Sequence, residues 1–241
     1  MPGIGSSSDP SPYNLKAQAK PGLFVFFRPE RWLEPLIDLV FPRRCGGCGQ
    51  VDTGWCPHCQ QLLDQAPIAT SLHSIPDLSK VASTGVLGGK LQQAIWAFKY
   101  ENQPHLAEVL GERLLRSLTV QDWIFDIIVP VPLHTSRLLK RGYNQAQLLS
   151  EYLADHLPQA CMPQAISRQR QTDSQVGLAQ KQRQKNVEGA FQADVETVKN
   201  RTILLVDDVV TTGATLSACA RSAFAAGASD VYGLTVSRAQ D

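Results

Sequence analysis

The sequence predicts a three-layer α/β domain with a mostly parallel sheet, preceded by a small module built on cysteines. Three apolar, β-rich runs, at 126–131, 203–206 and 231–236, have the composition of strands that are buried on both faces. Stretches with apolar residues at helical spacing lie between them. Strands that alternate with helices in this way usually form a parallel sheet with helices on both faces.

Length and charge limit the possibilities further. The 241 residues allow one sizeable domain with an appendage or two modest domains, and the net charge of +1 argues against a protein that is basic over its whole surface. We expect a disordered or irregular extension at 1–30, a helix and a cysteine module at 31–66, a linker at 67–80, and the main domain at 81–241.

The N-terminal segment predicts neither a secretory signal nor a membrane span. No basic start leads into a long apolar core. The apolar run 23–27 is followed by Arg28, Glu30 and Arg31 long before a bilayer could be spanned. We therefore expect a cytoplasmic protein.

Four cysteines form two Cys-x-x-Cys pairs soon after a short amphipathic helix expected at 31–41. The pairs are Cys45 with Cys48 and Cys56 with Cys59. Because cytoplasmic thiols stay reduced, this spacing favours a closed, structural Zn²⁺ site over disulfides, with unmetallated thiols as the alternative. His58 is a possible substitute ligand, but its position inside the second pair favours a bystander role.

The main domain is expected to start with a strand at 81–86 that turns at Gly88 and Gly89. Its first helix has apolar residues on one face and ends at Lys99 and Tyr100, and a second helix is expected at 104–118. Lys99 has two possible roles, which the sequence leaves open. It could stabilise the C-terminal end of its helix through the helix dipole, or it could contact a phosphate.

Three cations follow the strand at 126–131. Arg137, Lys140 and Arg141 lie within about one helical turn, just beyond Pro130 and Pro132. Such a cluster is usually a solvated helix face. Here it follows the end of a strand, where ligands bind in open α/β sheets, and its charge suits a pyrophosphate.

The most informative stretch is 203–215. An apolar strand at 203–206 leads into Asp207 and Asp208, and a Thr/Gly turn then opens a helix whose apolar residues run from Leu216 to Phe224 before Gly227, a plausible end of the helix. The N–H groups at such a helix start, with a glycine that permits close approach, form a cradle for a phosphate. Carboxylates accept hydrogen bonds from vicinal hydroxyls, so the predicted ligand is a ribose 5-phosphate. The alternative is an ordinary strand–turn–helix with solvated acids.

The segment 166–187 is rich in Arg and Lys and has little apolar periodicity. Its cations are Arg168, Arg170, Lys181, Arg183 and Lys185. A long polar segment between strands is uncommon in a compact domain unless it binds something. We expect a hood over the pyrophosphate end of the ligand. A plain surface loop and a site for nucleic-acid phosphates are the alternatives.

These blocks carry a resemblance. The run 203–215 resembles the phosphoribosyl pyrophosphate (PRPP) motif of type I phosphoribosyltransferases. The blocks Val129-Pro-Val-Pro-Leu-His134 and Arg141-Gly-Tyr-Asn-Gln145, together with the cysteine pairs, resemble the ComF family of competence-associated, phosphoribosyltransferase-like proteins. The matching blocks span about 41–238, and residues 1–30 lie outside them.

The resemblance implies a type I phosphoribosyltransferase-like fold with an N-terminal zinc ribbon. It implies that Asp207 and Asp208 hold the ribose hydroxyls and that the turn holds the 5-phosphate. The turn residues are Thr211, Thr212, Gly213, Ala214 and Thr215. Arg137, Lys140, Arg141 and Lys99 complete the expected ligand site, with Mg²⁺ accompanying PRPP.

Two functions then remain open. One is a Mg²⁺-dependent phosphoribosyltransferase in DNA uptake, whose acceptor the sequence does not identify. The other is a non-catalytic nucleotide-binding adaptor that contacts a competence helicase or single-stranded DNA through its cysteine module and basic loop. The two functions differ in whether the protein catalyses a reaction, and the sequence does not show whether it does.

Overall fold

The computed structural model describes residues 44–51, 53–68, 71–72, 74–170 and 189–239. Residues 42–241 belong to one compact unit. The extension expected at 1–30 and the helix expected at 31–41 lie outside the described residues, as does most of the basic segment, at 171–188. Among the helices that are described, none is both long and apolar enough to cross a bilayer.

The main sheet has six strands within the described ranges, in the order β1-β2-β8-β7-β3-β4. Their bounds are β1 (Ser71–Leu72), β2 (Lys80–Ser83), β3 (Ile127–Pro130), β4 (Ala160–Cys161), β7 (Thr202–Val210) and β8 (Asp230–Arg238). Only β1 runs antiparallel to its neighbour, β2, and the other paired strands are parallel. The predicted mostly parallel sheet is confirmed.

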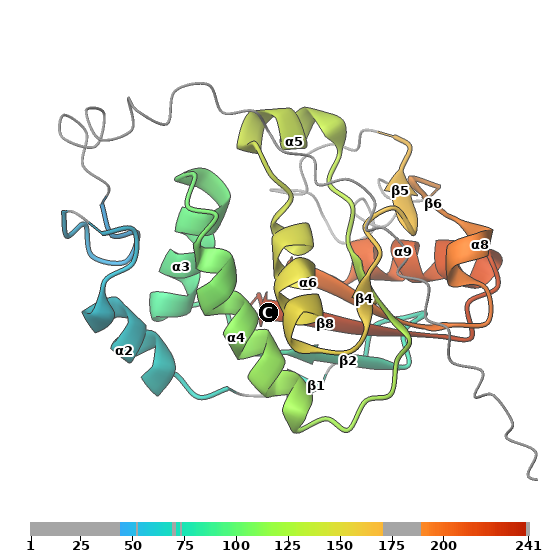
Figure 1. Cartoon of the computed structure of the whole chain (residues 1–241), viewed down its shortest axis with the longest axis horizontal. Coiled ribbons are helices and arrows are strands. Elements are labelled where there is room, and N and C mark those ends of the chain that lie inside the picture. Colours follow the sequence, from blue (N-terminus) through green and yellow to red (C-terminus); the bar gives the residue numbers. More distant parts are fainter. Residues whose placement is uncertain (1–43, 52, 69–70, 73, 171–188, 240–241) are drawn as a thin grey trace, which may run out of the picture. The chain divides into compact units, whose positions relative to one another are not determined.

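Helices cover both faces of this sheet (Figure 1). One face packs against α3 (Gly89–Tyr100), α4 (Leu106–Thr119) and α6 (Gln145–His156), and the other packs against α9 (Ala214–Ala225). The alternation of β7 explains this division, because Leu204 and Val206 join the first core and Ile203 and Leu205 join the second. The three-layer arrangement is therefore confirmed.

A two-stranded antiparallel sheet lies beside α9. It pairs β5 (Ile166–Arg168) with β6 (Phe191–Ala193) and is followed by the short helix α8 (Val195–Val198). The segment that we expected to lack regular structure from residue 166 thus begins as a strand. Ile166 is buried in the α9 core, and this burial anchors the strand.

Two strand boundaries differ from the expectation. The strand expected at 81–86 ends at Ser83, and only Val86 makes a further isolated bridge, to Arg238. The strand expected at 203–206 instead runs on to Val210, so both aspartates lie inside it. β8 extends to Arg238 and continues the ladder beside them, which overrides the low strand propensity of aspartate.

The helix α9 ends as predicted at Gly227, whose φ is 91°. The Gly227 N–H donates to Phe224 O at 2.9 Å and the Ala228 N–H donates to Ala223 O at 3.0 Å, which is the Schellman pattern. Phe224, expected on the apolar face, is 39% exposed. The buried face of α9 is formed by smaller residues, which let the helix approach the sheet closely.

A buried arginine joins the cysteine region to the main sheet. Arg113 of α4 is 3% exposed and donates to Leu63 O at 2.9 Å, near the end of α2 (Pro57–Gln65). It also donates to Ala66 O at 3.3 Å and to Thr84 O, just after β2, at 3.4 Å. These bonds offset the cost of burying the guanidinium.

Candidate functional site

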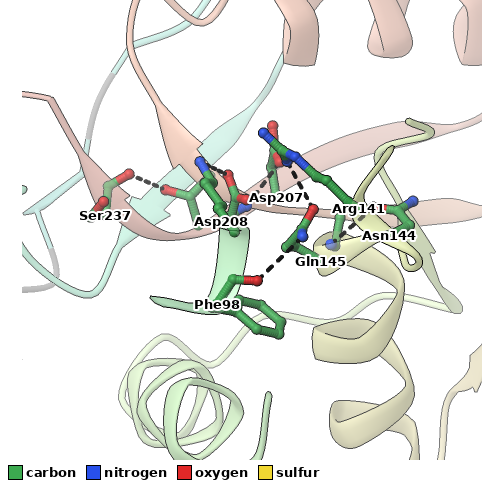
Figure 2. A network of polar contacts seen from close by, with 10 residues as sticks. Phe98, Arg141, Asn144, Gln145, Asp207, Asp208 and Ser237 are labelled. Atoms are coloured by element: carbon green, nitrogen blue, oxygen red, sulfur yellow. Dashed lines mark hydrogen bonds and ion pairs between the residues drawn. The ribbon is translucent and has the colours of Figure 1, made fainter. Parts of the chain in front are cut away.

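The candidate site lies at the carboxyl end of β7, where the two aspartates face different layers. Asp208 has the parity of Leu204 and Val206, and its Oδ1 lies 2.7 Å from Lys99 Nζ at the end of α3. Asp207 has the parity of Ile203 and Leu205, on the α9 side, and its Oδ1 accepts from the Asp208 N–H at 2.8 Å. Figure 2 shows the two side chains together with this network.

The two carboxylates differ in their surroundings. Burial is the main cause that raises the pKa of Asp207 to about 7, and the charge of Asp208 adds to it. Lys99, the Asp208 N–H and Arg141 oppose this rise. Asp208 has Lys99 as a direct counter-ion, whereas burial and the charge of Asp208 favour the protonated form of Asp207.

Lys99 has a partner that neither sequence interpretation included. It lies in the last turn of α3, where the helix dipole favours a cation, and its ammonium forms an ion pair with Asp208. Its side chain is 16% exposed and lines the cleft, so it remains within reach of a ligand.

The turn after β7 encloses a small hollow of about 30 Å³. Its lining includes Thr211, Gly213, Ala214, Thr215 and Asp207. Thr212 does not line it. Its Oγ1 accepts from the Ala214 N–H at 3.4 Å, and this hydrogen bond stabilises the conformation of the turn.

Gly213 starts α9 with a φ of 74°, which few residues other than glycine adopt. The sequence interpretation was that this glycine allows close approach of a phosphate. A Cβ at Gly213 would meet Ile75 Cγ2 at 2.7 Å. The turn geometry and the packing against Ile75 therefore give this position further reasons for a glycine, and the close approach of a phosphate stays a prediction.

The cations expected at the pyrophosphate end lie on α5 (Thr135–Arg141) and line the same cleft as the aspartates. Arg137 and Arg141 are half-buried and Lys140 is exposed. Arg141 Nη1 donates to Gln145 Oε1 at 2.9 Å, and Gln145 Nε2 donates to Phe98 O at 3.4 Å (Figure 2). Arg141 is thus held in place before any ligand binds.

The cleft has a volume of about 1030 Å³ and brings most of the predicted ligand residues together. Its lining includes Lys99, Arg137, Lys140, Arg141, Asp207, Asp208, Thr211 and Thr215. Arg168, at the end of β5, also lines it, with its guanidinium 5.3 Å from the Phe191 ring. Burial and then the charge of Arg137 lower the pKa of Arg168.

Several lining residues were not predicted as site residues. They include Tyr100, Asn102, Asn144 and Gln145. Arg168, by contrast, belongs to the basic segment that we expected to form a hood over the ligand. Asn144 caps α6 by accepting from the Ala146 N–H at 3.1 Å, and it donates to Val131 O at 3.1 Å. An Asn before an apolar helical repeat is a readable N-cap signal, so this residue was open to prediction.

The four paired cysteines form one cluster, and none is in a disulfide. The Sγ atoms of Cys45, Cys48, Cys56 and Cys59 all lie within 4.8 Å of one another. Cys48 Sγ and Cys56 Sγ are 3.6 Å apart, close to the spacing of about 3.8 Å that follows from four bonds of about 2.3 Å to a tetrahedral metal. The cluster can therefore hold a metal such as zinc. His58 is exposed and does not belong to it.

The thiols differ in their tendency to ionise. Burial raises the pKa of Cys45, but N–H donors from Cys56, Gly47 and Cys48 outweigh burial and leave it at about 7. Burial and the neighbouring thiols raise the pKa of Cys59 to about 12. A bound cation would stabilise thiolates at both positions, as a metal site requires.

The loop that carries the cluster also contacts α3, the helix whose last turn contains Lys99. Lys90 Nζ donates to Gly47 O at 2.5 Å, and Gln103 Nε2 donates to Arg44 O at 3.0 Å. A Cβ on Gly46 would meet Ala97 Cβ at 2.3 Å, so the backbone lies directly against the helix. The cysteine loop thus supports α3 along most of its length.

Comparison with known proteins gives relatives over most of the chain, although no family model matches. Solved structures align weakly: the glutamine PRPP amidotransferase from B. subtilis, complexed with ADP and GMP, has a TM-score of 0.41 and 14% identity, over 58% of this chain and 30% of that chain.

The relatives with curated names are closer in sequence. DNA utilization protein YhgH of Salmonella typhimurium is 31% identical over 185 residues, which cover 73% of this chain and 80% of that protein. Competence protein F of Haemophilus influenzae is 34% identical over 182 residues, which cover 72% of this chain and 75% of that protein. The chain therefore belongs to the family of competence protein F.

Proposed function

We propose that this protein binds Mg²⁺-PRPP, or a related ribose 5-phosphate, at the carboxyl end of β7 and transfers or holds the phosphoribosyl group during DNA uptake. One observation carries the proposal. A single cleft is lined by the two aspartates, by the turn that opens α9, and by the three cations of α5. These groups suit the hydroxyls, the 5-phosphate and the pyrophosphate of PRPP, respectively.

The hollow between β7 and α9 would hold the 5-phosphate. Thr211, Gly213, Ala214 and Thr215 line it, and α9 directs its positive N-terminal end toward it. Asp207 and Asp208 lie next to this hollow, as the ribose hydroxyls of a bound ribose 5-phosphate would require. Lys99 contacts Asp208 Oδ1, so Oδ2 of the same carboxylate would be the oxygen that accepts from a hydroxyl.

The residues of the cleft would stabilise the charges that develop during the reaction. Breaking the bond between the anomeric carbon and pyrophosphate builds positive charge on the ribose and negative charge on the leaving group. The carboxylates would stabilise the first and orient the sugar, while Arg137 and Arg141 would stabilise the second. A ribose hydroxyl that donates to Asp207 favours its ionised form, so ligand binding should release a proton from this group near neutral pH.

The site fits a magnesium ion that arrives with the ligand. Proteins hold Mg²⁺ through one or two carboxylates together with substrate phosphates, and Asp207 and Asp208 are the carboxylates of the cleft. When bound, Mg²⁺ neutralises charge on the pyrophosphate. At the other metal site, Cys45, Cys48, Cys56 and Cys59 would hold a structural Zn²⁺.

The setting of DNA uptake is supported by the names of the relatives, competence protein F and DNA utilization protein YhgH. Within that setting, turnover separates an enzyme from an adaptor. PRPP-dependent release of pyrophosphate in the presence of bases or DNA would establish an enzyme. Tight PRPP binding without release would establish the adaptor.

Calorimetry with Mg²⁺ tests the binding proposal directly. PRPP should bind the wild-type protein, and Asp208→Asn should weaken it by about ten-fold or more, because an amide accepts through one oxygen only. Asp155→Asn, at an exposed position of α6, is the matched control and should leave binding unchanged. Failure of the wild-type protein to bind PRPP or ribose 5-phosphate at millimolar concentration would overturn the proposal.

A further inference from the structure

The last turn of α3 contacts both halves of the proposed ligand site. Lys99 Nζ pairs with Asp208 Oδ1 at 2.7 Å, on the ribose side. The carbonyl oxygen of the preceding residue, Phe98, accepts from Gln145 Nε2 at 3.4 Å, and Gln145 Oε1 accepts from Arg141 at 2.9 Å, on the pyrophosphate side (Figure 2). Two adjacent residues of one helix therefore position an acidic and a basic group of the cleft.

Tyr143, in the link between α5 and α6, fastens the same turn a second time. Its hydroxyl donates to Phe98 O at 2.5 Å and accepts from the backbone N–H of Gln103, just beyond α3. The ring centroids of Tyr143 and Phe98 are 5.7 Å apart. Because Gln145 is only 2% exposed, water cannot readily replace its bonds to the helix and to Arg141.

The loop that carries the first cysteine pair contacts α3 at both of its ends. In the first turn of the helix, Lys90 Nζ donates to Gly47 O at 2.5 Å. Beyond the last turn, Gln103 Nε2 donates to Arg44 O at 3.0 Å. The N–H of Gly47 also donates to Cys45 Sγ at 3.4 Å. A single residue, Gly47, thus connects a sulfur atom of the cysteine cluster to α3.

We propose that the cysteine cluster and the ligand cleft are coupled through α3. Metal binding by the four paired cysteines fixes the loop at 44–48, since the free energy of metal binding at such sites is also free energy of folding. The ordered loop then holds α3 so that its last turn positions Asp208 and Arg141, whereas an unsupported helix end frays. Lys90 and Gln103 are positioning residues, which act through the helix. The inference rests on the proposed function and assigns its site a regulator, the metal.

Coupling of this kind is reciprocal. If zinc and the ligand both favour the same ordered arrangement of α3, each raises the affinity of the protein for the other by the same factor. The alternative is that the core residues of α3, such as Leu91, Ile95 and Phe98, hold the helix without help. Zinc would then order its own loop and leave the cleft unchanged.

The zinc-loaded, full-length protein tests the two positioning residues. The double variant Lys90→Met with Gln103→Leu removes both donors and keeps all four cysteines. It should retain zinc by metal analysis and bind Mg²⁺-PRPP about five-fold or more weakly in calorimetry, at the lower end of the usual range for allosteric coupling. Lys90→Arg, which keeps a donor, should bind PRPP as the wild-type protein does. Gln93→Leu, at an exposed position of α3, is the matched control. PRPP affinity at the wild-type level in the double variant would overturn the coupling.

A chelator competition tests the reciprocity. Saturating PRPP should raise the zinc affinity of the wild-type protein by the factor by which zinc raises its PRPP affinity. In the double variant this factor should fall to about one. A general link through folding stability would not depend on Lys90 and Gln103, so an unchanged factor in the double variant would contradict the proposed route.

Hydrogen exchange tests the coupling without any ligand. Removing zinc with a chelator should speed amide exchange at 97–103 and at 141–146, and leave the buried helix α9 unchanged at 216–223. Unchanged exchange at 141–146, or equal acceleration throughout the chain, would overturn the coupling. Failure of the wild-type protein to bind PRPP would overturn the proposed function instead, so the two failures are distinguishable.

Discussion

Lys99 Nζ and Asp208 Oδ1 are 2.7 Å apart and join the end of α3 to the end of β7. The two side chains are 16% and 10% exposed, so solvent screens the pair only partly. This ion pair fixes the position of one acidic residue of the proposed ribose site and ties that site to α3. Among the described residues, no cation forms an ion pair with Asp207.

Replacing Lys99 by Met should destabilise the protein, because Asp208 would stay buried without its counter-ion. We expect a loss of about 1–3 kcal/mol in the free energy of unfolding, measured by urea denaturation. The double variant Lys99→Met with Asp208→Asn should lose less than the sum of the two single variants, since the uncompensated charge is gone. Additive losses would mean that the two residues do not interact.

Asp207 predicts a pH dependence of stability. Its folded pKa of about 7 is above the ordinary value of a carboxyl group, so the folded protein binds this proton more tightly than the unfolded chain does. The stabilisation that this proton provides is present at low pH and is lost as the pH rises toward 7. Asp207→Asn should remove this trend and exceed the wild-type protein in stability at pH 8, as thermal melts across pH 5–8 would show. An unchanged pH profile would contradict the assignment.

Arg137→Ala and Arg141→Ala should weaken PRPP and pyrophosphate more than ribose 5-phosphate, which lacks the pyrophosphate. Each lost charge-assisted contact should cost about 1.5–3 kcal/mol of binding free energy if it is shielded from water. Lys140→Met should cost less, because Lys140 is exposed. Arg116→Ala, on the exposed face of α4, is the control for general loss of charge. Equal losses for all three ligands would mean that these arginines do not read the pyrophosphate.

Gly213→Ala should lower stability through two separate effects. The positive φ strains any other residue, and the new Cβ would meet Ile75 at 2.7 Å. Gly189→Ala is the matched comparison, since Gly189 has a φ of 64° but nothing within 4 Å of an added Cβ. We expect Gly213→Ala to cost about 1–3 kcal/mol more than Gly189→Ala in thermal or urea unfolding. Equal losses of stability for the two variants would mean that contact with Ile75 does not restrict residue 213.

The purified, reduced protein should contain one Zn²⁺ per chain by metal analysis. Cys45→Ser and Cys59→Ser should each lower the zinc content and the solubility, because metal binding at such sites also contributes folding free energy. His58→Ala should keep the zinc, since His58 is exposed and outside the cluster. Fresh protein without zinc, or zinc loss in the His58 variant, would contradict the Cys₄ assignment.

The sequence was sufficient for the elements whose signals are local. The apolar runs of β3, β7 and β8, the cysteine pairs and the end of α9 at Gly227 all follow from composition and spacing. The helix α6 was equally readable, from Asn144 as its cap and from Leu149 and Leu153 at helical spacing, but it was not predicted. Local patterns of this kind are available before the chain folds.

What the sequence did not indicate depends on partners that are distant in the sequence. The end of β7 at Val210 is set by the length of β8, and the role of Lys99 is set by Asp208 on another element. The strand β5, which carries Arg168 to the cleft, is set by its pairing with β6, and no periodicity around residue 168 indicates a strand. Tertiary context decides such features, and the propensities of the residues do not.

The bonds of Arg113 bear on how this architecture can be exchanged between proteins. The Arg113 guanidinium in α4 donates to carbonyl groups at the end of α2 and just beyond β2. The cysteine region therefore supplies acceptors that this arginine of the main domain requires. Transplanting the cysteine region onto a different α/β domain would take from Leu63 O and Ala66 O the donor that they share, and removing the region would leave a buried cation short of acceptors. Recombination at this boundary should therefore yield insoluble chimaeras unless the arginine travels with the region.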